Sequence, residues 1–142
     1  MIVYGDTSAL IKLVVRQPGT AEMLGLRTAV TLFAAAQIAY AELRAAVAAV
    51  RRDGRLRPAQ YEQAKTRIES LWQSTSPLEV DASLVRHAGQ LAEDQRLRGY
   101  DAVHLAALTR LRPAPECTLA SWDSELRRAA SALGYPLFPA AV

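Results

Sequence analysis

Short apolar runs alternate along this chain with longer segments whose apolar residues recur at helical spacing. Four runs predict strands, at residues 2–5, 28–33, 77–80 and 117–121, and a fifth short strand is expected near 136–138. The segments between them predict helices, at residues 7–15, 20–26, 36–52, 58–74, 82–96, 98–111 and 124–133. Strands separated by helices are typical of a parallel sheet covered on both faces. We therefore expect an α/β fold, a three-layer α/β/α sandwich with a mostly parallel central sheet.

Length and composition predict one domain over residues 1–142. The chain is 51% hydrophobic, so it has enough apolar surface for a real core. Its longest apolar stretch, 29–41, is interrupted by Thr31 and Gln37 and is shorter than the ~20 residues of a membrane span. The N-terminus lacks a basic start, so we expect no secretory signal. A single cysteine, Cys117, excludes an internal disulfide and favours a cytoplasmic location.

The basic residues are nearly all arginines. Of 17 basic residues only Lys12 and Lys65 are lysines, and the net charge is +3. Guanidinium groups suit phosphate recognition, so this balance is compatible with a nucleic-acid partner. A GC-rich genome would produce the same composition without any such role.

Three aspartates stand where an apolar run gives way to a helix. Asp6 follows the first strand, Asp123 follows the fourth, and Asp101 comes after Gly99 at the start of a helix. Each is explained by an N-cap role, which is worth about 1 kcal/mol. Asp81, in "LEVDASLV", has the same local pattern and is interpreted as a cap alone.

Glu42 is less easily explained. In "AAAQIAYAELRAAVAAVRR" the polar stripe contains Gln37, Tyr40 and Arg44, and Glu42 points roughly opposite to it. A glutamate on the apolar side of a helix is expected to be paired or to bind a metal. A salt bridge to an arginine from elsewhere in the chain is the structural alternative.

Taken together, the four acids predict a shared site for a divalent cation. In a parallel sheet, Asp6, Glu42, Asp101 and Asp123 can converge at one edge, where sites of α/β folds form. Two unit charges 4 Å apart repel by about 4 kcal/mol at an effective dielectric constant of 20. Such a cluster makes sense if its oxygens hold a divalent cation such as Mg²⁺, which commonly pairs with phosphate.

Four motifs carry a resemblance to a known family. "VYGDTSALIKL", "AYAELRAAV", "LRGYDAVHLAAL" and "LASWDSELRRAA" resemble, in order and spacing, the acidic motifs of PIN-domain ribonucleases, and above all the VapC toxins of type II toxin–antitoxin systems. The resemblance spans nearly the whole chain. "YDAVHLA" is the most specific motif. Gly5 and Ala36 depart from the family pattern, which has a larger apolar residue and often a serine there, and neither departure removes a ligand.

This resemblance implies a PIN domain over residues 1–142 with metal-dependent endoribonuclease activity. It implies one or two Mg²⁺ ions, for which Mn²⁺ substitutes, that activate water to hydrolyse RNA. It also implies homodimerisation and inhibition by a small VapB-like antitoxin laid across the site. The implied metal-binding and catalytic acids are Asp6, Glu42, Asp101 and Asp123, and the implied supporting hydroxyls are those of Thr7 and Ser121.

Other residues near the motifs are weaker candidates. His104, one helical turn after Asp101, could reach the site, but we expect a packing role for it. Trp122 is interpreted mainly as a packing residue, with base stacking as the alternative. Arg127 and Arg128 either meet phosphate or form a solvated helix face.

Two other functions fit parts of the pattern. "DTS" after a strand suits a phosphohydrolase with a nucleophilic aspartate, but that class expects a second aspartate where Ser8 stands, and neither lysine is well placed. A degenerate PIN domain that only binds a partner is the non-enzymatic alternative, and the retention of all four acids argues against it.

Overall fold

The computed structural model describes residues 1–142, which form one parallel sheet with helices on both faces. The strand order is β3-β2-β1-β4-β5, and all four strand pairs are parallel. The strands are β1 Ile2–Gly5, β2 Leu32–Ala36, β3 Ser76–Leu78, β4 Thr118–Ala120 and β5 Leu137–Phe138. The helices are α1 Thr7–Leu10, the 3₁₀ turn η1 Ile11–Leu13, α2 Thr20–Ala29, α3 Ile38–Arg52, α4 Pro58–Gln73, α5 Ala82–Gln95, α6 Gly99–Leu111 and α7 Ser124–Ala132. The three-layer α/β/α prediction is confirmed.

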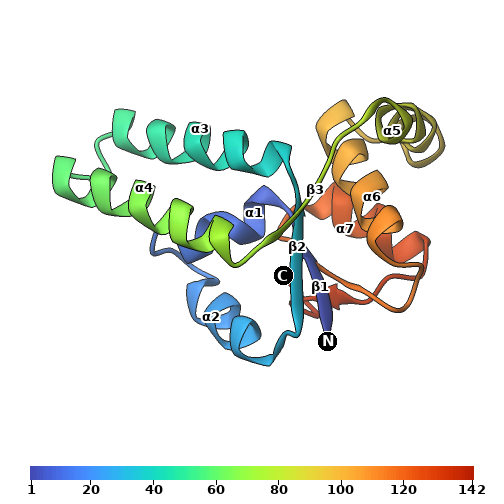
Figure 1. The fold of residues 1–142 in the computed structure, drawn as a ribbon, viewed down its shortest axis with the longest axis horizontal. Coiled ribbons are helices and arrows are strands. Elements are labelled where there is room, and N and C mark those ends of the chain that lie inside the picture. The colour runs from blue at the N-terminus through green and yellow to red at the C-terminus, as the bar shows by residue number, and fades with distance from the viewer.

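The sheet separates two hydrophobic cores (Figure 1). Helices α1 to α4 cover one face and α5 to α7 cover the other. Neighbouring strand residues alternate between the cores, since side chains point to opposite faces with a period of two. Val3 packs in the core under α1 to α4 and Tyr4 in the core under α5 to α7, and Ala120 and Leu119 divide in the same way.

One predicted strand was wrong. Residues 28 and 29 belong to α2, and the second strand is Leu32–Ala36 instead of 28–33. The Thr28 hydroxyl donates to the Gly25 carbonyl oxygen at 2.7 Å, which extends the helical turn over a β-branched residue. Ala34 to Ala36 are fully buried, so the packing of two helical layers against the sheet outweighs the low strand propensity of alanine.

The first predicted helix was too long. Instead of running over 7–15, it breaks after Leu10 into η1, which ends at Leu13. The Lys12 carbonyl oxygen accepts a hydrogen bond from the Thr20 hydroxyl at 2.8 Å, where a continuing helix would use a backbone N–H. The helix predicted from residue 36 begins at Ile38, because Ala36 still belongs to β2. The helix predicted over 20–26 runs three residues further, to Ala29. The remaining predicted elements agree with the structure within two residues at each end.

The topology creates a switch point beside the central strand. Chain order runs outward from β1 through β2 to β3 and then returns to the other side of β1 as β4. Ligand sites of open α/β sheets form beyond the carboxyl ends of the strands at such a point. None of the helices combines the length and hydropathy of a membrane span.

Candidate metal centre

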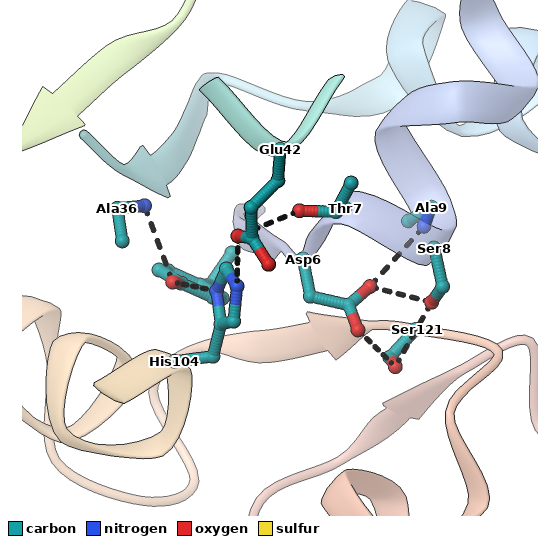
Figure 2. Close-up of polar contacts among 9 residues, drawn as sticks. Asp6, Thr7, Ser8, Ala9, Ala36, Glu42, His104 and Ser121 are labelled. Carbon is teal, nitrogen blue, oxygen red and sulfur yellow. Dashed lines mark hydrogen bonds and ion pairs between the residues drawn. The ribbon is translucent and has the colours of Figure 1, made fainter. Parts of the chain in front are cut away.

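Asp6 lies at the switch point, directly beyond the end of β1. The neighbouring strands bring Gly5 of β1 beside Ala120 of β4, so the next residues, Asp6 and Ser121, face each other. The Ser121 hydroxyl donates to Asp6 Oδ2 at 2.8 Å (Figure 2). The sheet register therefore joins the first acid to the segment that carries the last one.

Three hydrogen bonds fix the Asp6 carboxylate. Oδ1 accepts from the Ser8 hydroxyl at 2.7 Å and from the Ala9 backbone N–H at 3.1 Å, which makes Asp6 the N-cap of α1. Asp6 is only 5% exposed. Burial raises its pKa, although a nearby His104 charge and the three hydrogen bonds act in the opposite direction. Both predicted roles, cap and member of an acidic site, are thus compatible at one residue.

Glu42 reaches the same edge from the first turns of α3. Its Oε1 accepts from the Thr7 hydroxyl at 2.9 Å and is 2.8 Å from His104 Nε2 (Figure 2). The side chain is 29% exposed, and its ion-pair partner is His104 and not the arginine offered as the alternative. Burial would raise the Glu42 pKa, but the His104 and Thr7 contacts outweigh burial and lower it.

His104 packs in the core, as predicted, but it also makes polar contacts that the prediction did not include. Its side chain is 4% exposed, but both ring nitrogens make polar contacts: Nε2 with Glu42, and Nδ1 with the Tyr4 hydroxyl oxygen at 2.7 Å. Burial would lower the His104 pKa, yet the Glu42 hydrogen bond and the charges of Asp6, Glu42 and Asp101 raise it. The spacing in "YDAVH" contained the signal, because residues three apart lie on one side of a helix.

The N-cap interpretation of Asp101 was wrong. Arg98 is the N-cap of α6, and Asp101 stands within its first turn. The Asp101 side chain is 18% exposed and accepts no hydrogen bond from the protein, and its ion-pair contact is the Arg98 Nε atom at 3.9 Å. Burial raises the Asp101 pKa, and so do the negative charges of Asp123 and Glu42. A carboxylate without a capping role is therefore held near two others.

Asp123 is the N-cap of α7. Its Oδ1 accepts from the Leu126 backbone N–H at 2.8 Å, and its own N–H donates to the Ser121 hydroxyl at 3.0 Å. Asp81 is a cap, as predicted: it accepts from the Leu84 N–H at 2.8 Å. Its second oxygen is 3.0 Å from Arg110 Nη1, away from the four acids.

The donor set suits a hard divalent cation. Every one of the four carboxylates keeps an oxygen that accepts at most one hydrogen bond: Oδ2 of Asp6 and of Asp123, Oε2 of Glu42, and both oxygens of Asp101. Oxygen atoms with free lone pairs are the ligands that Mg²⁺ takes. The four side chains do not form a coordination sphere in this structure. No three Asp, Glu, His or Cys side chains lie close enough together to hold an ion. A cation would relieve the repulsion that Asp123 and Glu42 exert on Asp101.

Ser8 supports the site and was not among the predicted residues. Its hydroxyl donates to Asp6 Oδ1 and accepts from the Trp122 N–H at 2.8 Å. The Trp122 ring packs at 4.6 Å from Lys12 Nζ and at 6.3 Å from the Phe138 ring, so packing accounts for its position. The supporting hydroxyls thus divide between the acids: Ser8 and Ser121 contact Asp6, and Thr7 contacts Glu42.

The two arginines of α7 contact the protein itself. Arg127 donates from Nη1 to the Ser121 carbonyl oxygen at 2.9 Å. Arg128 donates from Nη2 to the Gln95 carbonyl oxygen at 2.7 Å and pairs with Glu125 at 3.0 Å. These contacts join α7 to its surroundings, which favours a structural interpretation of both side chains.

The two departures from the family pattern have local explanations. A Cβ atom on Gly5 would lie 2.7 Å from the Phe33 ring, so the large side chain of β2 occupies the space that a larger residue would fill. Ala36 ends β2, and its backbone N–H donates to the Tyr4 hydroxyl at 3.2 Å. Neither position bears a group that the four acids depend on directly.

Comparison with known proteins identifies the family. The PIN domain model matches residues 3–131. The ribonucleases VapC45 and VapC49 of two Mycobacterium tuberculosis strains are each 36% identical to this chain over 139 residues, which is 98% of this chain and 96% of each relative.

Solved structures share the fold at low sequence identity. FitAcB from Neisseria gonorrhoeae superposes with a TM-score of 0.72 at 19% identity, covering 95% of this chain and 96% of that one. A toxin–antitoxin complex from Klebsiella pneumoniae gives 0.64 at 15% identity, covering 100% and 96%. The family match, the length of the 36% identity and the shared fold agree with the four acidic motifs, and the chain belongs to the VapC group of PIN-domain proteins.

Proposed function

We propose that this chain is a divalent-metal-dependent endoribonuclease and the toxin of a VapBC-type toxin–antitoxin pair. Its ribonuclease relatives VapC45 and VapC49 support the activity class. The observation that best supports the metal dependence is the environment of the Asp101 carboxylate. This carboxylate is half-buried and accepts no hydrogen bond, and the charges of Asp123 and Glu42 raise its pKa, although Arg98 and His104 act in the opposite direction. Burying such a group is costly unless a positive charge compensates it.

The proposed ligands are Asp6, Glu42, Asp101 and Asp123, with Mg²⁺ as the physiological ion and Mn²⁺ as a substitute. When bound, the ion would shield the scissile phosphate and lower the pKa of the attacking water. Asp6 would act from a fixed position, because three hydrogen bonds already orient it. Glu42 would present Oε2, since Thr7 and His104 occupy Oε1.

The geometry disfavours the aspartate-nucleophile alternative. Ser8, where that class expects an acid, instead donates to Asp6. A binding module without activity would have no need of a carboxylate that accepts no hydrogen bond and lies beside two other acids.

We further propose RNA as the substrate, a small antitoxin as an inhibitory partner, a homodimeric assembly and a cytoplasmic site of action. The toxin–antitoxin complex from Klebsiella pneumoniae, which shares the fold, supports the antitoxin proposal. The net charge of +3 and the predominance of arginine suit a polyanionic substrate.

The test is incubation of purified, antitoxin-free protein with total RNA in Mg²⁺, with mapping of the cut ends. The matched control is Asp81→Asn, which changes an acid that caps α5 and pairs with Arg110 away from the site. We expect cleavage by wild type and Asp81→Asn in Mg²⁺, and none in EDTA. Equal cleavage with EDTA would reject the metal dependence, and no cleavage under any ion would favour a binding module.

A further inference from the structure

A chain of polar contacts runs from the backbone of β2 to Glu42. The Ala36 N–H donates to the Tyr4 hydroxyl at 3.2 Å, and that hydroxyl is 2.7 Å from His104 Nδ1. On the other side of the ring, Nε2 is 2.8 Å from Glu42 Oε1 (Figure 2). Tyr4 is fully buried, so water does not compete for its hydroxyl.

When the His104 ring is neutral, the donor and acceptor types of these groups determine the direction of each hydrogen bond. A backbone N–H only donates, so the Tyr4 oxygen is an acceptor toward Ala36. The single Tyr4 hydroxyl hydrogen then has one acceptor within reach, His104 Nδ1. An Nδ1 atom that accepts leaves the ring hydrogen on Nε2, where it is donated to Glu42. A protonated ring also carries hydrogen on Nε2, so both forms donate to Glu42.

The excluded form is the tautomer with a bare Nε2 atom. It would point a nitrogen lone pair at the Glu42 carboxylate. The Tyr4 oxygen would then accept from both Nδ1–H and the Ala36 N–H, and the Tyr4 hydroxyl hydrogen would lose its acceptor. The backbone of β2 thus selects the tautomer of a residue on α6. Two donors, His104 and Thr7, then converge on Oε1 and leave Oε2 free.

We propose that His104 is a positioning residue for Glu42, held by Tyr4 so that Glu42 directs Oε2 toward the metal ion. The proposal rests on the proposed function, in which Glu42 is a ligand. Groups that hold metal ligands in place commonly contribute about 10- to 100-fold to metal affinity. His104 itself does not contact the ion in this role.

The first test measures Mn²⁺ binding by isothermal titration calorimetry, with no substrate present. His104→Leu removes the donor, and we expect the dissociation constant to rise about 10- to 100-fold. His104→Gln places an amide N–H near the position of Nε2 and should restore most of the affinity. Tyr4→Phe removes the group that selects the tautomer and should give an intermediate loss.

Tyr135→Phe is the matched control. It removes a hydroxyl that donates to the Arg112 carbonyl oxygen at 2.8 Å, in the same core and away from the acids. We expect it to lower stability while leaving the Mn²⁺ dissociation constant unchanged. If His104→Leu and Tyr4→Phe bind Mn²⁺ as wild type does, His104 only packs and the proposal is overturned.

The second test needs no variant at the site. The chain has two histidines, His87 and His104, so ¹⁵N resonances of the imidazole rings are assigned by comparison with His87→Asn. We expect His104 Nε2 to bear hydrogen in the Mn²⁺-free protein and in the protein loaded with diamagnetic Mg²⁺. A bare Nε2 would overturn the proposal. A wild-type protein that binds no Mn²⁺ would instead reject the proposed metal site and the positioning role with it.

Discussion

Ser121 and Asp6 are 115 residues apart in the sequence, and a 2.8 Å hydrogen bond joins their side chains. The same Ser121 hydroxyl accepts from the Asp123 N–H at 3.0 Å. One hydroxyl therefore links the first and the last acid of the candidate centre, across the junction of β1 and β4. This contact and the capping of α7 together hold Asp123 in place relative to Asp6.

Asp101→Asn should abolish metal-dependent RNA cleavage and retain the fold. The substitution removes a ligand charge at a position that neither caps α6 nor accepts a hydrogen bond. It also removes a repulsion with Asp123 and Glu42, so metal-free stability should be unchanged or higher. Cleavage assays in limiting Mg²⁺ and thermal unfolding in EDTA measure the two effects, with Asp81→Asn as the control. Activity equal to wild type would remove Asp101 from the site.

Asp123→Asn should separate capping from metal binding. Asparagine caps helices about as well as aspartate, so the Leu126 contact and the stability in EDTA should persist. Mn²⁺ at ten times the dissociation constant should stabilise wild type by about 1.4 kcal/mol, which is roughly 3–6 °C in melting temperature for a domain of this size. The variant should gain less. Equal shifts in the two proteins would show that Asp123 is a cap alone.

Gly19→Ala should destabilise the fold by about 1–3 kcal/mol. Gly19 has φ +96°, and an added Cβ would lie 2.6 Å from Lys12 Cδ and 2.9 Å from the Trp122 ring. Gly25→Ala is the control, because it lies inside α2 with no atom within 4 Å of the new Cβ. Alanine there should be neutral or stabilising by up to about 1 kcal/mol. Urea unfolding of both variants checks the difference, and a loss at Gly25 equal to that at Gly19 would contradict it.

Cys117 should be unreactive in the native protein. Burial raises the pKa of its thiol to about 11. A thiol whose folded pKa exceeds its unfolded value contributes stability below pH 9.0, and that contribution is lost as the pH rises toward 11. A disulfide reagent at pH 8 should modify the urea-unfolded chain at once and the folded chain only at the rate of unfolding. Rapid modification of the folded protein would contradict the burial of the thiol.

Local physics in the sequence determined much of the fold. Alternating apolar runs and amphipathic segments established the order of strands and helices, because side-chain periodicity reflects which face is buried. The caps at Asp6, Asp81 and Asp123 were also predictable, since a cap needs only the residues that follow it. The position of Glu42 on the apolar side of α3 indicated a paired acid without identifying its partner.

Tertiary structure decided what depends on distant residues. Ala34 to Ala36 form a strand because two helical layers bury them, and no propensity of alanine predicts that. Asp101 is not a cap, since α6 begins at Gly99 with Arg98 before it. His104 contacts Glu42 and Tyr4, which are 62 and 100 residues away, and only the packing of α6 against the sheet brings them together. The sequence contains the acids, but their long-range hydrogen bonds, which orient them, exist only in the folded chain.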